Sequence, residues 1–225
     1  ALSARLILEV DRDGQHWDAE FEKGGKLTRR ITSVGPAPKD RSTGEPRTGT
    51  TVTFWPDGTI FDETEFRAQT VIERLQIMAF LNKGLEIRFT DERTDPVTKT
   101  TYKYNGGIVD FVKHLNASKE SLFRKVASFE QAEDGQEVEI ALQWNAGYHE
   151  SIHSFANGIS TIEGGMHVEG FSKALTNVVN RYARARNLLK EKEDNLKGED
   201  IREGLTAIIS VRLRDPQFEG QTKSK

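Results

Sequence analysis

"EVEIALQWN" (137–145) alternates apolar and polar side chains, and this pattern decides the fold of the second half of the chain. Val138, Ile140, Leu142 and Trp144 fall on one face, because successive side chains of a β-strand point to opposite sides. The pattern therefore predicts a strand with one buried face. "ESIHSFANGI" (150–159) follows closely, and we expect it to be the antiparallel partner of this strand.

Three helices and one strand are predicted around this pair. Residues 105–116 and 168–190 have apolar side chains at helical spacing, and residues 198–204 form one or two helical turns between glycines. "LTAIISVRL" (205–213) is almost continuously apolar and predicts a strand that is mostly buried.

The first half begins with a predicted β-hairpin. "DRDG" (11–14) separates two extended segments, 5–10 and 15–22, and Asp-Gly between strands is a strong turn signal. Residues 33–49 are rich in proline, glycine and charge and predict a long surface loop. "TTVTFW" (50–55) then predicts a strand that ends at Pro56.

A helix is predicted over residues 63–84, with Asn82-Lys83-Gly84 as its C-terminal stop. Its apolar side chains share roughly one face: Phe66, Val71, Leu75, Met78 and either Leu81 or Phe80. Residues 85–89 and 100–104 are extended segments around a polar turn. We place a domain boundary near residue 100.

Composition bounds the class of protein. The chain has 225 residues, 36% hydrophobic and 30% charged, with a formal net charge of −3. This balance is typical of a globular protein, so nucleic-acid binding would need a local basic patch. The sequence has no cysteine, which excludes disulfides and thiolate chemistry and fits a reducing cytoplasm. No apolar run predicts a membrane span. The chain enters a strand directly after Ala1, and we expect it to be a fragment.

Two motifs resemble a zinc site and a phosphate loop, but their sequences do not fit those structures. "HESIH" (149–153) matches a zinc signature, but that chemistry needs both histidines on one side of a helix. Glycine, asparagine and β-formers flank it, and on a strand the two histidines lie about 13 Å apart. We therefore interpret it as a strand with two histidines. "EKGGKLT" (22–28) lacks the spacing and ending of a phosphate loop, and predicts a turn.

Two basic segments stay open on the residues alone. The segment from Phe171 to Lys190 carries no acid, and its cations could face a nucleic-acid backbone or only solvent: Lys173, Arg181, Arg184, Arg186 and Lys190. "FEGQTKSK" (218–225) places Gln221 and Lys223 on the same side if it is extended. It is either a frayed end or a contact for a phosphate.

Five long stretches resemble the B subunits of bacterial DNA gyrases, a family of type II topoisomerases. They occur in matching order: "RTGTTVTFWPD" (47–57), "MAFLNKGLEIRFTDER" (78–93), "EVEIALQWNAGYHESIHSFANGI" (137–159), "EGGMHVEGF" (163–171) and "DIREGLTAIISVRLRDPQFEGQTKSK" (200–225). The resemblance implies an α+β fold. Residues 1–100 would be the second half of a GHKL-type nucleotide-binding α/β sandwich. Residues 101–225 would be a C-terminally truncated transducer domain with a left-handed crossover.

The resemblance also implies roles for individual residues. The family's Q-T-K loop falls on Gln221, Thr222 and Lys223, and the lysine and glutamine of that loop contact the terminal phosphate of ATP. Thr50 would help hold the adenine, and Val52 would line its pocket. Arg12 would lie at the rim where coumarin inhibitors bind, although the residues alone also allow an ordinary hairpin arginine.

For the parent protein, the resemblance implies an ATP-hydrolysing topoisomerase that uses Mg²⁺ and introduces negative supercoils into DNA in the cytoplasm. Its partners would be DNA, the gyrase A subunit in a heterotetramer of two A and two B subunits, and a second B subunit when ATP is bound. The general-base glutamate and the ATP lid would precede Ala1, so we expect the fragment to be inactive and to bind no cofactor. The alternative is a non-catalytic module that binds DNA or a partner through residues 171–190.

Overall fold

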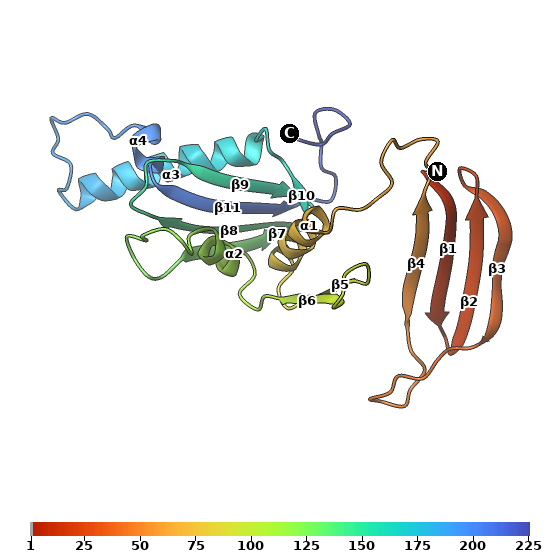
Figure 1. The fold of residues 1–225 in the computed structure, drawn as a ribbon. Coiled ribbons are helices and arrows are strands. Elements are labelled where there is room, and N and C mark those ends of the chain that lie inside the picture. Colours follow the sequence, from red (N-terminus) through yellow and green to blue (C-terminus); the bar gives the residue numbers. More distant parts are fainter. Residues whose placement is uncertain (1) are drawn as a thin grey trace. The chain divides into compact units, whose positions relative to one another are not determined.

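The computed structural model describes residues 2–225, and the chain divides into two compact units, Ala1–Arg67 and Ala68–Lys225 (Figure 1). The first unit contains only β-strands, and the second combines helices with strands, which confirms the predicted α+β class. The predicted domain boundary near residue 100 lies later in the chain than the division between these units, and it stays a prediction. No helix within residues 2–225 is long and apolar enough to cross a membrane.

The first unit is one antiparallel sheet with the strand order β3-β2-β1-β4. Its strands are β1 Ser3–Arg12, β2 Gln15–Glu22, β3 Lys26–Pro36 and β4 Gly49–Pro56. The predicted hairpin is confirmed, because β1 and β2 meet at Asp13 and Gly14, whose φ angles are 52° and 73°. Both angles lie in the left-handed region that a tight hairpin turn requires.

Strand β3 corrects the prediction for residues 33–49. The strand continues to Pro36, so the surface loop begins only after it. Nearly every side chain of β3 is exposed, and its register with β2 is interrupted by bulges. A strand without a buried face has no alternating apolar pattern, which is why this one could not be recognised.

The second unit holds eleven helices and strands within residues 68–225. In chain order they are α1 Ala68–Leu81, β5 Glu86–Asp91, β6 Thr98–Lys103, α2 Ile108–Leu115, β7 Ala127–Glu133, β8 Gln136–Trp144, β9 Ser151–Ala156, β10 Ile159–Ser160, α3 Met166–Ala185, α4 Gly198–Arg202 and β11 Leu205–Arg212. Five of the strands form one sheet in the order β10-β9-β11-β8-β7, and β5 pairs with β6 in a separate hairpin.

Helices cover both faces of the five-stranded sheet (Figure 1). On one face Phe80 of α1 and Phe111 of α2 pack against the sheet together with Ile208. On the other face Phe171 of α3 packs with Ile140 and with residues of β11. The alternation predicted for residues 137–145 is therefore correct, and the strand has a second apolar contact on its reverse face.

Strand β11 occupies the centre of this sheet and corrects one predicted pairing. It is antiparallel to β8 and parallel to β9, so residues 150–159 do not pair with β8. Residues Leu205–Val211 are buried on both faces, as a central strand requires, whereas β9 is less continuously apolar. The connection between β9 and β11 crosses over through α3 and α4, and its predicted left-handedness stays a prediction.

Both long helices are shorter than predicted. Helix α1 begins at Ala68 rather than at residue 63. Phe66 belongs to the first unit and packs edge-on against Phe54 within that unit, with ring centroids 5.8 Å apart. Helix α3 ends at Ala185 rather than at residue 190, because Asn187 adopts a left-handed φ of 55° and Leu188 N donates back to Ala183 O.

Candidate functional site

Three of the predicted site residues lie on one face of the first sheet. The cross-strand register places Thr50 opposite Val10 and Val52 opposite Leu8, so these side chains point to the same side. Arg12 is two residues beyond Val10 and shares that side. Val52 is 53% exposed, and the Arg12 side chain is 78% exposed, with its Nε 3.5 Å from Asp13. The fold thus brings these three side chains together on an open surface.

That surface is apolar across all four strands. One row of it runs through Leu27, Phe21, Leu6 and Phe54, which face one another in register. Leu27 and Phe54 are 46% and 48% exposed, so large apolar side chains of this face remain accessible. An exposed apolar wall beside a threonine hydroxyl and an arginine suits a planar organic ligand with polar edges.

The reverse face of the same sheet carries a buried clamp that sequence analysis missed. Asp11 is 5% exposed; its Oδ1 lies 2.6 Å from His16 Nδ1, and its Oδ2 accepts a hydrogen bond from Arg47 Nε at 2.8 Å. Hydrogen bonds from His16 and then Arg47 lower the pKa of Asp11 below its ordinary value. Because Arg47 directly precedes Thr48-Gly49-Thr50, the clamp fixes the start of β4. The hairpin was predicted, but its register, which pairs Asp11 with His16, was not, because residues 11–14 were all assigned to the turn.

The tail, defined as residues 213–225, contains a turn at Lys223 and not the extended conformation that would place Gln221 and Lys223 on the same side. Lys223 has a left-handed φ of 55°, and its backbone N–H donates to Gly220 O. Gln221 and Lys223 are both exposed, and Lys223 Nζ lies 5.6 Å from the ring centroid of Phe218, a cation–π distance. Both side chains are accessible to a ligand, and Lys223 already has an aromatic contact that a ligand would have to replace.

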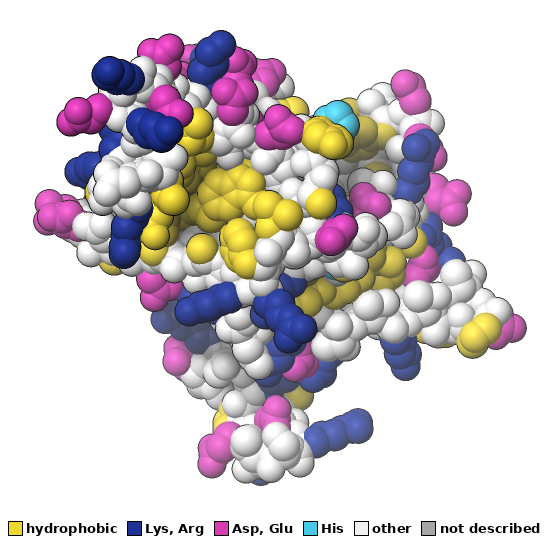
Figure 2. Space-filling model, turned by 90° about the vertical axis from the view of Figure 1, so that its left-hand side faces the viewer, with side chains coloured by type: hydrophobic (Ala, Val, Ile, Leu, Met, Phe, Trp, Pro, Cys, Tyr) yellow, Lys and Arg dark blue, Asp and Glu magenta, His cyan; other side chains and the backbone are white. Residues whose placement is uncertain are grey.

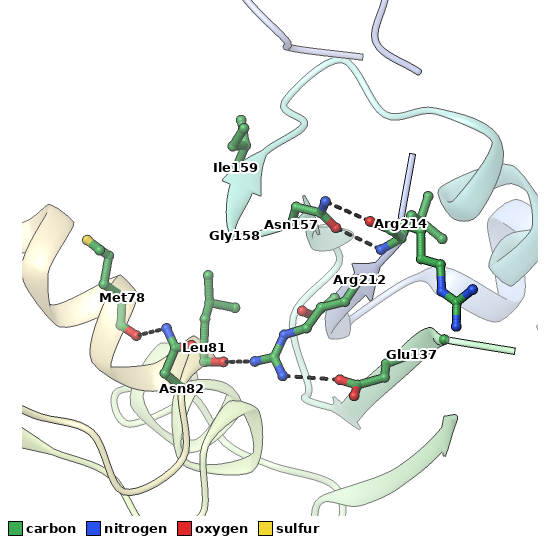
Figure 3. A pocket seen from close by; sticks show the side chains of 12 residues that line it. Met78, Leu81, Asn82, Glu137, Asn157, Gly158, Ile159, Arg212 and Arg214 are labelled. Atoms are coloured by element: carbon green, nitrogen blue, oxygen red, sulfur yellow. Dashed lines mark hydrogen bonds and ion pairs between the residues drawn. The ribbon is translucent and has the colours of Figure 1, made fainter. Parts of the chain in front are cut away.

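The root of the tail is held by Arg212, the last residue of β11 (Figure 3). Its guanidinium donates to Leu81 O at the end of α1 at 3.0 Å and to Glu137 Oε2 at 3.1 Å. The Asn157 side chain makes two hydrogen bonds with the backbone of Leu213, at 2.7 and 2.9 Å. These residues line a cavity of about 610 Å³. Because its polar groups largely bond one another, we assign it a structural role in fixing the root of the tail.

The predicted DNA-facing cations of α3 fall into two groups. Lys173 and Arg181 are exposed on the helix, although Lys173 Nζ lies 3.7 Å from Glu169. Arg186 follows the helix and stacks on Tyr182. Arg184 differs, because its guanidinium donates to Lys190 O, Glu193 O and Asn195 Oδ1 and thereby holds the loop after α3.

The surface at the C-terminal end of α3 is mixed in charge. Figure 2 shows lysine and arginine side chains interspersed with aspartate and glutamate around a hollow of hydrophobic side chains. The loop after α3 itself contains Lys190 and Lys192 but also Glu191, Glu193 and Asp194. Any phosphate contact would therefore depend on individual exposed cations rather than on a uniform basic field.

"HESIH" is not helical, as predicted. His153 lies on β9, and His149 precedes that strand. The His153 ring lies tilted beside Phe111, with ring centroids 6.0 Å apart. The pKa of His153 is lowered, chiefly by burial and also by the charge of Lys119. The two histidines are thus not on consecutive turns of a helix, which the zinc signature requires.

A family model described as DNA gyrase B matches residues 107–225. Among curated proteins, the DNA gyrase B protein of Mycobacterium tuberculosis is 48% identical over 255 aligned residues, which cover 100% of this chain and 36% of the relative. The novobiocin-sensitive DNA gyrase B protein of Streptomyces niveus is 49% identical, with 100% and 35% covered. The chain therefore spans about a third of the length of these relatives.

Two solved structures of gyrase B proteins are also similar to this chain. The 43K ATPase domain of Thermus thermophilus gyrase B, in complex with an aminocoumarin, has a TM-score of 0.81 at 35% identity, covering 97% of this chain and 57% of that one. The gyrase B protein from Myxococcus xanthus has a TM-score of 0.83 at 27% identity, with 99% and 61% covered.

Proposed function

The chain belongs to the DNA gyrase B family, and on that premise we propose that it forms part of the ATP-binding region of a gyrase B protein. The complete protein would couple ATP binding and hydrolysis to DNA strand passage and negative supercoiling. The observation that carries this is the exposed turn of Gln221 and Lys223, which presents an ammonium group and an amide at the family's Q-T-K position.

The physical role of Lys223 is that of a tether. An ammonium group binds a terminal phosphate strongly because the hydrogen bond is charge-assisted, and loses that partner when the phosphate leaves. The same charge stabilises negative charge on the transferring phosphoryl group. Thr50 and Val52 would contact the adenine, since a hydroxyl and an apolar wall suit a planar heterocycle with polar edges.

The complete protein would also use Mg²⁺. Within residues 2–225, however, no group of three or more histidine, aspartate or glutamate side chains could hold a metal ion. We assign no Mg²⁺ ligand to this chain, and no step of the mechanism is derived through that ion. We keep the expectation that this chain by itself does not hydrolyse ATP.

Partners and inhibitors are proposed on the same premise. The complete gyrase B protein would act in the cytoplasm in a heterotetramer of two A and two B subunits, and would dimerise when ATP binds. Arg12 would contact coumarins at the pocket rim, because its guanidinium is exposed beside the Thr50 and Val52 face. An Arg12→Ala variant should lose coumarin affinity while its ATP hydrolysis is retained.

The test of the main proposal is Lys223→Ala in the complete gyrase B protein, with Lys225→Ala as the matched control in the same tail. Removing one charge-stabilising donor should lower the rate of ATP hydrolysis by about 100-fold or more. Lys225 pairs with Glu219 at 3.4 Å, and losing that surface pair should leave the rate nearly unchanged. Near-normal hydrolysis by Lys223→Ala would remove the assigned role.

A second candidate function is DNA binding by α3, which the exposed side chains of Lys173, Arg181 and Arg186 favour. Replacing Arg181 with Ala should reduce the slope of log affinity against log salt by about 0.9 if it contacts one phosphate. Arg184 is unsuitable for this test because its donors hold the loop after α3. An unchanged slope for the triple replacement of Lys173, Arg181 and Arg186 would exclude this surface.

A further inference from the structure

The loop before α3 receives the tail. The backbone N–H of Glu163 donates to Ser224 O at 2.9 Å, and Ser224 directly follows Lys223. Tail residues Pro216 and Phe218 line a cavity of about 560 Å³ together with His167 in the first turn of α3. The tip of the tail therefore rests on the N-terminal end of the helix that carries the exposed cations.

We propose that residues 161–167 relay the position of the tail to α3, with Thr161 and His167 as its positioning residues. This rests on the proposed function, because it requires Lys223 to exchange Phe218 for a phosphate. It adds a route by which the nucleotide state reaches α3, the helix with the exposed cations.

The relay residues form one connected hydrogen-bond chain. Thr161 is 2% exposed, and its hydroxyl lies 2.7 Å from the Ser154 hydroxyl of β9 and 3.0 Å from His167 Nε2 of α3. The Ser154 hydroxyl also donates to Thr161 O at 2.9 Å. Since Thr161 is bonded to both a strand and the helix, a displacement of this loop must move His167 or break a buried hydrogen bond.

Glycines make the loop tight enough to transmit such a displacement. Gly164 and Gly165 have φ angles of 85° and 141°, which side chains rarely adopt. A Cβ on Gly165 would lie 3.0 Å from the His167 ring. The backbone therefore packs directly against His167, without a flexible side chain between them.

Two positions of the tail supply the switch. In the position described here, Lys223 lies over Phe218 and Ser224 is bonded to the loop. A Lys223 ammonium bound to phosphate cannot remain over that ring unless the ligand also lies there. The relay requires the backbone of Lys223 and Ser224 to move with the ammonium, which would change the Ser224–Glu163 hydrogen bond. Binding of the phosphate thus favours one of two loop positions.

The experiment uses gyrase reconstituted from the complete A and B subunits. Thr161→Val removes the hydroxyl and keeps the shape, and Thr161→Ser restores the hydroxyl. Thr176→Val makes the same change on α3, where the hydroxyl donates to Ser172 O of the same helix. ATP hydrolysis and supercoils introduced per ATP are measured for each, beside Lys223→Ala.

For Thr161→Val we expect near-normal hydrolysis and about tenfold fewer supercoils per ATP, the size of effect that one lost buried hydrogen bond produces. Thr161→Ser and Thr176→Val should behave as the unmodified enzyme. Unchanged supercoils per ATP in Thr161→Val, or an equal loss in Thr176→Val, would overturn the relay. Normal hydrolysis by Lys223→Ala would instead overturn the proposed function.

A second measurement needs no substitution in the loop. Amide hydrogen exchange of residues 161–167 in the complete gyrase B protein is compared with and without a non-hydrolysable ATP analogue. The relay predicts that the nucleotide changes the protection of the Glu163 amide in the unmodified protein. In Lys223→Ala the nucleotide should leave that protection unchanged. Identical exchange in the unmodified protein with and without nucleotide would contradict it.

Discussion

The two larger sheets of this chain differ in how far their apolar faces are buried. In the second unit helices cover both faces of the five-stranded sheet, and Ile208 and Ile209 of its central strand are 0% and 1% exposed. In the first unit only Ala19 and Ala37 are buried apolar side chains within residues 2–67. Phe54 and Val52, which would be core residues in a covered sheet, are about half exposed there.

In the first sheet, the ion pairs and the predicted ligand contacts therefore lie on opposite faces. Ion pairs hold the polar face of the first sheet, among them Arg29 with Asp18 at 2.9 Å and Arg47 with Asp11 at 2.8 Å. Its apolar face is exposed at Val52 and Phe54, and the proposed adenine contacts lie on that face. In the second unit, the tail is held at its start by Arg212 and Asn157 and near its end by the Ser224–Glu163 hydrogen bond.

The largest expected effect compares one buried and one open apolar residue. Ile208→Ala should destabilise the second unit by about 3–4 kcal/mol, because it leaves a cavity between α1, α2 and the sheet. Val52→Ala should cost the first unit about 1 kcal/mol or less, since its side chain is 53% exposed. Amide exchange of β11 and β4 during urea unfolding measures the stability of the two units separately. Equal losses of stability in the two variants would contradict the proposed difference between the sheets.

A smaller effect is expected for matched threonines. Thr206 of β11 is 0% exposed and donates to Asn116 Oδ1 at 2.7 Å within a buried amide network. Thr206→Val should cost about 1–3 kcal/mol, because the buried Asn116 Oδ1 loses its short hydrogen bond and keeps the longer one from Asn145 Nδ2 at 3.5 Å. Thr53→Val on the exposed β4 should change stability by at most about 0.5 kcal/mol. Urea unfolding measures both changes in the free energy of unfolding. An unchanged free energy for Thr206→Val would show that the buried amide network does not stabilise the second unit.

The smallest effect concerns acid, and it falls on the first unit. The pKa of Asp11 is lowered from 3.8 by its hydrogen bonds with His16 and Arg47. A depressed carboxyl pKa stabilises the fold above 3.8, and this stabilisation is lost as the pH falls through the lower value in the folded state. The urea midpoint of the first unit should therefore fall below pH 3.8. Asp11→Asn should weaken this dependence, with Asp40 and Asp57 still contributing because their pKa values are also lowered, by hydrogen bonds from Ser42 and Thr59. Asp13→Asn in the exposed turn should preserve it.

Elements with a clear apolar pattern could be predicted from the sequence. The alternation of residues 137–145, the Asp-Gly hairpin and the apolar run at 205–213 all correspond to observed strands. Strand β3 could not be predicted because it buries no face. The partner of β9 was wrong because alternation shows which side is buried but not which strand is adjacent, and β11 is supplied from about 50 residues later in the chain.

Some residues of the candidate site could be predicted and others could not. Thr50, Val52 and Arg12 were assigned by resemblance, and the hairpin and strand register place them on one face. The Asp11 clamp was missed because Arg47 reaches it from a loop, and no periodicity predicts such a contact. The turn at Lys223 was missed because a left-handed lysine is set by contacts of the tail with Phe218 and Glu163, far apart in sequence from each other.

The central claim is that Lys223 binds the terminal phosphate of a nucleotide. A crystal structure of the complete gyrase B protein with a non-hydrolysable ATP analogue tests it most directly, through the distance from Lys223 Nζ to the nearest terminal phosphoryl oxygen. We predict about 3 Å, a charge-assisted hydrogen bond, with the ammonium moved off Phe218. A Lys223 side chain that still lies over Phe218, or that points into solvent while the nucleotide is bound, would contradict it.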